Sequence, residues 1–286
     1  MDPTANANWE CQLNFAVMKP VIRILGESFL YSCSFDIAHI YEQFVPEHVL
    51  VYQISGQTQI YHQRGEMVLE AGNVLLARKN QFAKSIKIPA KDKPYQCISI
   101  LLTGDRLKQY ALDNKIVCNE QHFGNKNILL EDAGVLTDYF LSILPYVEPG
   151  KNVSKALALA KVNEAVAMLV EIRPDLKPLL FDFSDPHKQN LEEFMLKNFH
   201  HNAPIKHFAK LSGRSLSSFK RDFAETFKVS PGTWLKEKRL SEAYYLIKKK
   251  SQKPRDIYLE LGFENLSHFY TAFKRKYGHT PAEIKL

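Results

Sequence analysis

The stretch SLSSFKRDFAETFKVSP, residues 215–231, is followed fifty residues later by a second version of itself, NLSHFYTAFKRKYGHTP, residues 265–281. The two copies agree where one face of a helix would require it: Leu216 with Leu266, Phe219 with Phe269, Phe223 with Phe273, Phe227 with Tyr277 and Pro231 with Pro281. At 100° per residue these side chains form a narrow apolar stripe. The sequence therefore predicts two similar amphipathic helices.

Each predicted helix has a polar face opposite the apolar stripe and a polar residue suited to capping its N-terminus. The caps are Ser215 and Asn265. The outer faces carry Ser217, Ser218 and Arg221 in the first copy, with Lys220 on the flank, and Ser267, His268, Thr271 and Lys274 in the second. Before each copy stands a short helical segment and a glycine, IKHFAKLSG ending at Gly213 and RDIYLELG ending at Gly262. Helix, glycine turn and second helix is the helix-turn-helix arrangement.

Charge separates this region from the rest of the chain. From His187 onward there are 20 Lys and Arg against 10 Asp and Glu, a net charge of +10, whereas the preceding residues carry a net charge of −3. A basic C-terminal third on a slightly acidic body indicates a domain that meets a polyanion. Charge alone does not distinguish a nucleic acid from a membrane surface.

A single amphipathic helix is more often just a solvated face of a bundle, but a duplicated helix-turn-helix in a basic region favours DNA. Residues 231–249 can form one helix of about 28 Å at ~1.5 Å per residue. Such a rod could hold two recognition helices about one DNA turn, ~34 Å, apart. One chain would then present two helices to successive major grooves.

The last hundred residues resemble the DNA-binding domain of the AraC/XylS family of bacterial transcription regulators. The resemblance is carried by FAKLSGRSLSSFKRDF, by SPGTWLKEKRLSEAYYLI and above all by LGFENLSHFYTAFKRKYGHTPAEI. It implies two helix-turn-helix units joined by a long helix. Two departures are Tyr258, where the family often has alanine, and Thr271, where many members have an arginine that faces the bases.

The resemblance implies roles for the polar faces. In the first unit Ser217, Ser218 and Arg221 would reach base edges, because arginine bidentate to guanine is the commonest specific contact, and Lys220 would hold a phosphate. In the second unit Ser267 and Thr271 would face the bases, with His268 and Lys274 beside the DNA backbone. No residue is assigned to a catalytic or metal site.

The first hundred residues predict β structure. Runs such as HVLVYQI, NVLLA and QCISILL alternate with turn signals such as Ser55-Gly56 and Ala71-Gly72-Asn73, which is typical of a sandwich or closed barrel. Helical spacing replaces this pattern from Leu136 and after Asn152, with Leu159, Val162, Val166 and Leu169 on one apolar face. The rhythm and the fragments PEHVLVYQISGQTQI and EAGNVLLA resemble the cupin-like sensor domain of many AraC-type proteins.

The predicted fold is therefore α+β with two domains. Residues 1–173 form a cupin-like β-barrel with flanking helices, for sensing and dimerisation; residues 174–187 form a linker, in which LLFDF packs against a neighbour; residues 188–286 form the all-α double helix-turn-helix domain. The resemblance implies an activator that binds double-stranded DNA, contacts RNA polymerase, forms a homodimer and responds to a small molecule or a regulatory protein. That effector's identity stays open.

An enzyme is the alternative class. A metal-dependent cupin would need clustered histidines, but His39, His48 and His62 lack the close spacing of such a site, so neither a metal nor another cofactor is predicted. The pair Ser217 and Lys220 matches SxxK, a pattern that also arises by chance, and HExxH, GxSxG and Walker motifs do not occur.

The cell compartment follows from what the sequence lacks. The start MDPTANANWE does not have the pattern of a signal peptide, and no apolar run approaches the ~20 residues of a membrane helix. The four cysteines are widely spaced and predicted to be reduced thiols. We expect a cytoplasmic protein without membrane partners.

Overall fold

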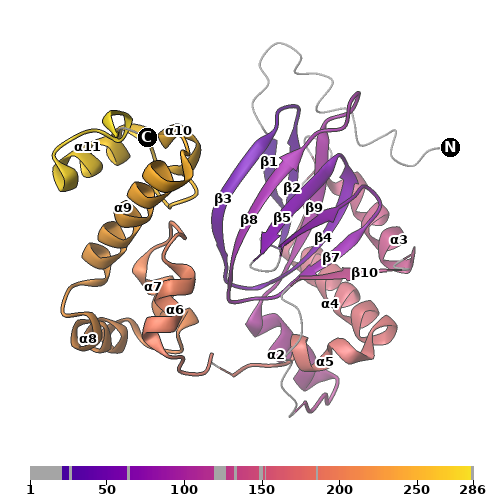
Figure 1. The fold of residues 1–286 in the computed structure, drawn as a ribbon. Helices are drawn as coiled ribbons and strands as arrows, with labels where there is room; N and C mark the ends of the chain where they lie inside the picture. The colour runs from indigo at the N-terminus through magenta and orange to yellow at the C-terminus, as the bar shows by residue number, and fades with distance from the viewer. Residues whose placement is uncertain are drawn as a thin grey trace. The chain divides into compact units, whose positions relative to one another are not determined.

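The computed structural model describes residues 21–25, 28–62, 65–118, 127–131, 134–147, 151, 153–184 and 186–284. The chain divides into two compact units: the first contains residues up to Ser184 except Tyr41–Phe44, and the second contains the rest. The first unit combines strands with helices, and the second is helical (Figure 1). The predicted α+β fold with two domains is confirmed.

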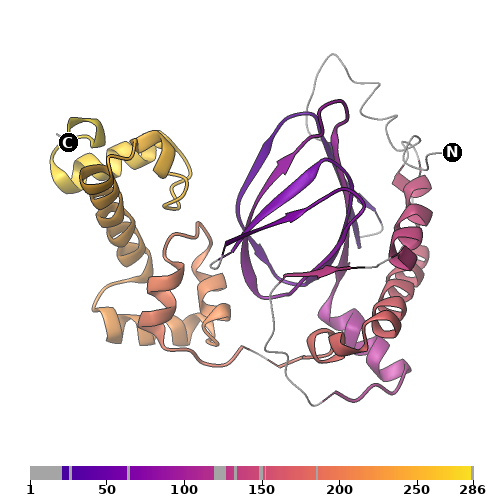
Figure 2. The ribbon, with the colours of Figure 1, turned by 45° about the vertical axis from the view of Figure 1, so that its right-hand side comes forward.

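The first unit is built on two antiparallel sheets. Their strands are β1 (Val21–Leu25), β2 (Phe29–Ser34), β3 (Ala38–Val45), β4 (His48–Ser55), β5 (Gln57–His62), β6 (Gly65–Leu69), β7 (Val74–Ala77), β8 (Gln81–Ile88), β9 (Tyr95–Leu102) and β10 (Asn127–Leu130). One sheet has the order β1-β2-β9-β4-β7-β10 and the other β3-β8-β5-β6. The sheets curve toward each other as two walls, which gives the cupin-like form (Figure 2). In the described residues these are two sheets, not one continuous barrel.

Helices cover the outer face of the six-stranded sheet. They are α2 (Gly104–Asp113), α3 (Gly134–Ile143) with the 3-10 turn η2 (Leu144–Val147), and α4 (Lys155–Ile172). Leu50 and Ile98 of the sheet share one core with Phe140 of α3, whose ring stacks on Tyr52 at 5.2 Å. On α4 the predicted apolar face is confirmed, because Val162, Val166 and Leu169 are buried and Leu159 is partly buried.

Most of the predicted linker, residues 174–187, is structured. Pro174–Leu176 form the turn η3 and Lys177–Leu180 the short helix α5, and the side chains of Leu176, Leu179, Leu180 and Phe181 lie in the core of the first unit. The apolar run of the linker explains this, since leaving four large apolar side chains in water would cost several times ~1.5–3 kcal/mol. The first unit therefore extends past residue 173.

The second unit consists of α6 (Leu191–Asn198), α7 (Ile205–Leu211), α8 (Leu216–Phe227), α9 (Pro231–Lys250), α10 (Pro254–Ile257), α11 (Leu266–Tyr277) and the turn η4 (Pro281–Glu283). The two repeated helices, α8 and α11, lie at opposite ends of α9 (Figure 1). The helix predicted over RDIYLELG is shorter than expected. It ends at Ile257, and residues 258–262 continue as hydrogen-bonded turns, with Phe263 N donating to the Tyr258 carbonyl at 3.0 Å.

The structure bears on the predicted state of the cysteines and on the hydrophobicity of the helices. Cys97 and Cys118 are free thiols, but Cys33 is disulfide-bonded, so the expectation of reduced thiols is wrong for that residue. None of the described helices combines the length and hydrophobicity that crossing a membrane requires.

Candidate DNA-binding surface

Buried phenylalanines hold α8 and α11 in place. Phe219 and Phe223 of α8 and Phe269 and Phe273 of α11 are completely inaccessible to solvent. The predicted apolar stripe is thus confirmed in both helices. One member differs, because Leu216 at the start of α8 is 42% exposed.

Both repeated helices, α8 and α11, begin at the predicted caps. The Ser215 hydroxyl accepts a hydrogen bond from the Ser218 amide at 3.2 Å, and the Asn265 side-chain oxygen accepts one from the His268 amide at 2.7 Å. Each bond satisfies an amide that the first helical turn would otherwise leave without a partner. The two helices therefore begin at equivalent positions of the repeat.

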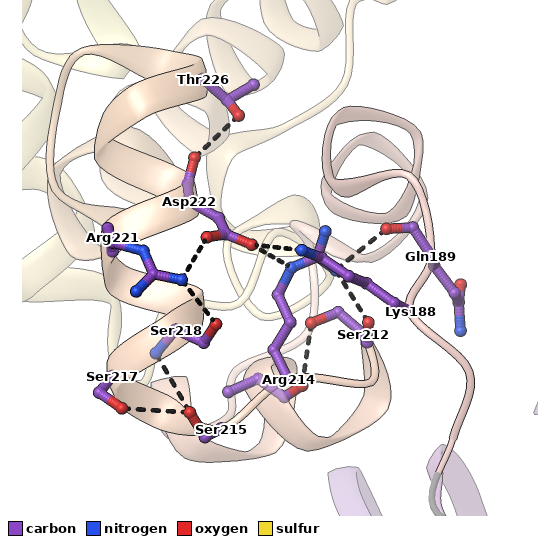
Figure 3. A network of polar contacts seen from close by, with 11 residues as sticks. Lys188, Gln189, Ser212, Arg214, Ser215, Ser217, Ser218, Arg221, Asp222 and Thr226 are labelled. Atoms are coloured by element: carbon purple, nitrogen blue, oxygen red, sulfur yellow. Dashed lines mark hydrogen bonds and ion pairs between the residues drawn. The ribbon is translucent and has the colours of Figure 1, made fainter.

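The side chains predicted to contact DNA lie on the outer faces. Ser217, Lys220 and Arg221 on α8 are exposed and Ser218 is partly so; Ser267, His268, Thr271 and Lys274 on α11 are all exposed. The Arg221 side chain is 75% exposed, and one of its terminal nitrogens lies 3.3 Å from the Ser218 hydroxyl. The structure thus brings Ser217, Ser218 and Arg221 together on α8 (Figure 3) and places the second set apart, on α11.

A polar network that the sequence analysis did not predict joins α8 to the residues that precede it in the chain (Figure 3). Asp222 Oδ2 accepts from Lys188 Nζ at 3.0 Å and from Arg214 Nε at 3.1 Å. Arg214 is only 6% exposed, and its Nη1 also donates to the carbonyls of Ser212 and Gln189 at 2.8 and 3.0 Å. The hydrogen bond from Lys188, followed by that from Arg214, lowers the pKa of the Asp222 carboxyl.

This network fixes the recognition helix to the turn before it and to the segment that leads into α6. Asp222 Oδ1 also lies 3.4 Å from Arg221 Nη2, so the same carboxylate contacts the exposed arginine of the helix. A signal for it existed in the sequence. Asp222 is an acidic residue beside the apolar stripe of α8, eight residues after the turn arginine Arg214.

The central helix α9 is a 20-residue rod, about 30 Å long at ~1.5 Å per residue. Near its start Trp234 packs on the Phe227 ring of α8 at 4.9 Å, and farther along Tyr244 packs on the Tyr277 ring of α11 at 4.8 Å. Each recognition helix is therefore docked on α9 by aromatic contacts.

The candidate metal ligands of the first unit do not form a site in the described residues. His48 is the first residue of β4, and its side chain is fully buried rather than exposed to solvent. The side chains of His39 and His62 lie outside the described part. No group of three or more His, Cys, Asp and Glu side chains with metal-binding geometry occurs in the part of the chain that the structure describes.

Comparison with known proteins accounts for both units. A helix-turn-helix domain family matches residues 208–285, and the family of the ExsA N-terminal regulatory domain matches residues 48–177. The thermoregulatory protein LcrF of Yersinia pestis is 25% identical over 82% of this chain and 84% of its own length. The regulator ExsA of Pseudomonas aeruginosa is 31% identical over 45% of this chain and 47% of its own. The chain belongs to the AraC/XylS family.

Solved structures similar to this AraC/XylS-family regulator include one of ToxT from Vibrio cholerae. ToxT is 15% identical, the match covers 90% of this chain and 97% of ToxT, and the TM-score is 0.43. The matched families describe a regulator of transcription that binds DNA through its C-terminal domain and is controlled through its N-terminal domain. The relatives that match are transcription regulators and not enzymes.

Of the two family departures, Tyr258 now has a structural position. It caps the C-terminus of α10 and lies partly buried against the core formed by α9 and α11. Its ring occupies space that an alanine would leave to its neighbours. Thr271, the other departure, is exposed on α11.

The end of α8 provides a test of how this family member is stabilised. Lys228 adopts a left-handed conformation, with φ of 59°, at the position where the second copy has Gly278, with φ of 80°. A residue with a Cβ atom costs roughly 1–2 kcal/mol there relative to glycine. We expect Lys228→Gly to raise the free energy of unfolding of the C-terminal unit by about 1 kcal/mol. Urea unfolding followed by the fluorescence of Trp234, in a background with Trp9→Phe, measures this change.

The reverse substitution is the control. Gly278→Lys places a side chain in the same conformation at the end of α11 and should lower stability by a similar amount. Equal stabilities of Lys228→Gly and the unsubstituted chain would mean that the left-handed residue costs nothing at this helix end.

Proposed function

We propose that this regulator activates transcription by inserting α8 and α11 into successive major grooves of one bipartite operator. The observation that carries the proposal is the pair of capped, phenylalanine-backed helices at opposite ends of α9. The length of α9, about 30 Å, is close to the ~34 Å between successive major grooves on one side of a duplex. Activation, rather than repression, is favoured by the relative named a virulence regulon transcriptional activator, VirF of Yersinia enterocolitica.

The polar faces give each side chain a role in this proposal. Ser217, Ser218 and Arg221 contact base edges from α8, and Lys220 on its flank holds a phosphate. On α11, Ser267 and Thr271 contact bases, whereas His268 and Lys274 contact the sugar-phosphate backbone. The exposure of these side chains supports the assignment.

Regulation by the first unit involves a small molecule or a protein partner. The space between its sheets holds buried polar side chains bonded to one another: Thr58 Oγ1 donates to Gln53 Oε1 at 2.8 Å and lies 2.9 Å from the Tyr95 hydroxyl. A small molecule would have to replace these bonds, which favours a protein partner bound on the surface. Thermal-shift titration of the full chain with metabolites, compared with capture of partners from lysate, separates the two effectors.

The remaining partners also belong to the proposal. A homodimer formed through α3 and α4 would occupy tandem or inverted operators, and contact with RNA polymerase would start transcription. Since the target is chromosomal DNA, the site of action is the cytoplasm. A catalytic metal-cupin is the competing hypothesis, and stoichiometric metal in purified protein would support it.

Replacing Arg221 tests the proposed contact with bases. We expect Arg221→Ala to reduce discrimination at one base pair of the operator by about 1–3 kcal/mol, because a bidentate arginine–guanine contact is lost. The measurement begins with genomic mapping of bound DNA. Titration of the selected operator and its three single-base variants at that position then gives the discrimination, at one stated salt concentration.

Lys220→Ala is the matched control, since it removes one positive charge from the same helix. It should weaken binding to all the duplexes by a similar factor, without changing the preferred base. Uniform loss with Arg221→Ala would make that residue a phosphate contact. If the full chain prefers no duplex over a scrambled one, the proposed function itself is wrong.

A further inference from the structure

Arg239 lies in the middle of α9 and bonds three backbone carbonyls from two separate parts of the second unit. Its Nε donates to Phe199 O at 2.8 Å, its Nη1 to Gly262 O at 2.9 Å and its Nη2 to His201 O at 2.6 Å. None of these partners is a side chain. The guanidinium group therefore fixes the position of the backbone at three residues.

Two of the carbonyls lie directly before the first helix-turn-helix, and the third lies in the turn of the second. Phe199 and His201 lie in the connection that leads from α6 into α7, the first helix of the first helix-turn-helix, while Gly262 lies in the turn that leads to α11, in the second helix-turn-helix. One planar group with a fixed fork of donors thus joins the scaffolds of both recognition helices. His200, between Phe199 and His201, lies next to Gly262.

The two turns touch each other directly beside this arginine. A Cβ atom placed on Gly262 would lie 2.6 Å from the His200 carbonyl oxygen and 2.9 Å from Arg239 Cζ. Gly262, with φ of 78°, also adopts a conformation that favours glycine. The junction therefore consists of two backbones in contact and one guanidinium group that bonds both.

A second set of bonds holds α11 against the same helix. Lys276 Nζ lies 2.6 Å from Glu237 Oε2 and donates to the Ser241 hydroxyl at 3.0 Å. These contacts fix α11 to α9, but they do not reach the first helix-turn-helix unit. Arg239 bonds both the segment that leads into the first helix-turn-helix and the turn of the second.

We propose that Arg239 is a positioning residue that fixes the separation and rotation of α8 and α11, so that the protein binds two half-sites of one set spacing. The inference rests on the proposed function of the two helices. Two helices held in register gain from each other's binding, because the second half-site is met at a high effective concentration. A loose junction loses this gain while each helix still binds its own half-site.

The experiment uses the full chain with an operator selected from a random duplex library. Binding is measured to the intact operator, to each half-site with the other scrambled, and to operators lengthened by one to five base pairs between the halves. We expect Arg239→Gln to lower affinity for the intact operator at least about tenfold and for each half-site less than about twofold. The penalty for added base pairs should shrink accordingly.

Two further variants separate positioning from charge and from folding. Lys236→Gln removes one positive charge from an exposed site on α9 and should leave the spacing preference unchanged. Arg239→Lys keeps the charge but cannot form the three-pronged contact, so it should behave like Arg239→Gln. This variant also covers the case in which Arg239→Gln does not fold.

A comparison of two glycines gives an independent measurement. Gly262→Ala places a methyl group in the junction and should reduce the difference in affinity between the intact operator and a half-site. Gly278→Ala introduces the same backbone strain, with φ of 80°, but no atom lies within 4 Å of its Cβ position, so the spacing preference should persist.

Equal losses on intact operator and half-sites, or an unchanged spacing preference in folded Arg239→Gln and Arg239→Lys, would overturn the inference while leaving the proposed function intact. If the unsubstituted chain selects no bipartite duplex, both fail together.

Discussion

Gly213→Ala is expected to destabilise the C-terminal unit by about 3 kcal/mol or more, a large part of the ~5–15 kcal/mol that a typical domain has. Gly213 has φ of 72°, where a side chain costs roughly 1–2 kcal/mol. A Cβ atom there would also lie 2.4 Å from the Pro186 carbonyl oxygen and 2.5 Å from the His187 carbonyl group. These are backbone atoms, which cannot turn aside as a flexible side chain can.

The measurement is urea unfolding of the full chain, followed by Trp234 fluorescence in the Trp9→Phe background. Gly278→Ala is the control, because Gly278 has a similar φ of 80° with open space around its Cβ position. It should cost only about 1 kcal/mol. Similar losses in the two variants would show that strain alone, and not the close approach of residues 186–187, requires glycine at position 213.

Acid is expected to destabilise the first unit through His48. Burial, followed by the positive charges of Lys79 and Arg78, lowers the pKa of His48 from 6.5 to about 3, against the opposing effects of Asp182 and the Leu179 carbonyl. The unfolded chain therefore takes up the proton first. The contribution of neutral His48 to the free energy of unfolding is fully present above pH 6.5 and is lost as the pH falls toward 3. Between pH 7 and 4.5 the free energy of unfolding should fall by roughly 2.5 kcal/mol.

His48→Gln separates this effect from that of other titrating groups. Glutamine can still accept the bond that Lys79 N donates to His48 Nδ1 at 3.3 Å, but it does not take up a proton in this range. Hydrogen–deuterium exchange of peptides from β4 and β9 in urea reports the stability of the first unit separately from the second. The unsubstituted chain should lose more stability than the variant on acidification, and parallel pH profiles would contradict the buried neutral state of His48.

The helices of the second unit were predictable because their signals are local. The apolar spacing from Phe219 to Phe227, the caps Ser215 and Asn265, and the prolines after each helix all act within a few residues. Strands β4, β7 and β9 were predicted for the same reason. The sequence analysis did not predict β1, β2, β10 or α2. It also assigned too many residues to the linker, because Leu179 and Leu180 pack in a core that includes residues from distant strands.

The candidate site divides in the same way. Exposure of Arg221 and Thr271 follows from helical periodicity, and so the outer faces were predicted residue by residue. The brace formed by Lys188, Arg214 and Asp222 was missed, because its members come from three segments whose proximity depends on how the helices pack.

The sequence by itself determined that the chain carries two equivalent amphipathic helices on a basic, helical domain, because repetition, periodicity and charge are properties of the order of residues. Only the tertiary structure decided what holds those helices relative to each other. Arg239 is one more basic residue in the sequence, and its three carbonyl partners are 40, 38 and 23 residues away. Contacts over such distances depend on the packed backbone, since closing loops of that length costs chain entropy, which the packing of the rest of the fold must offset.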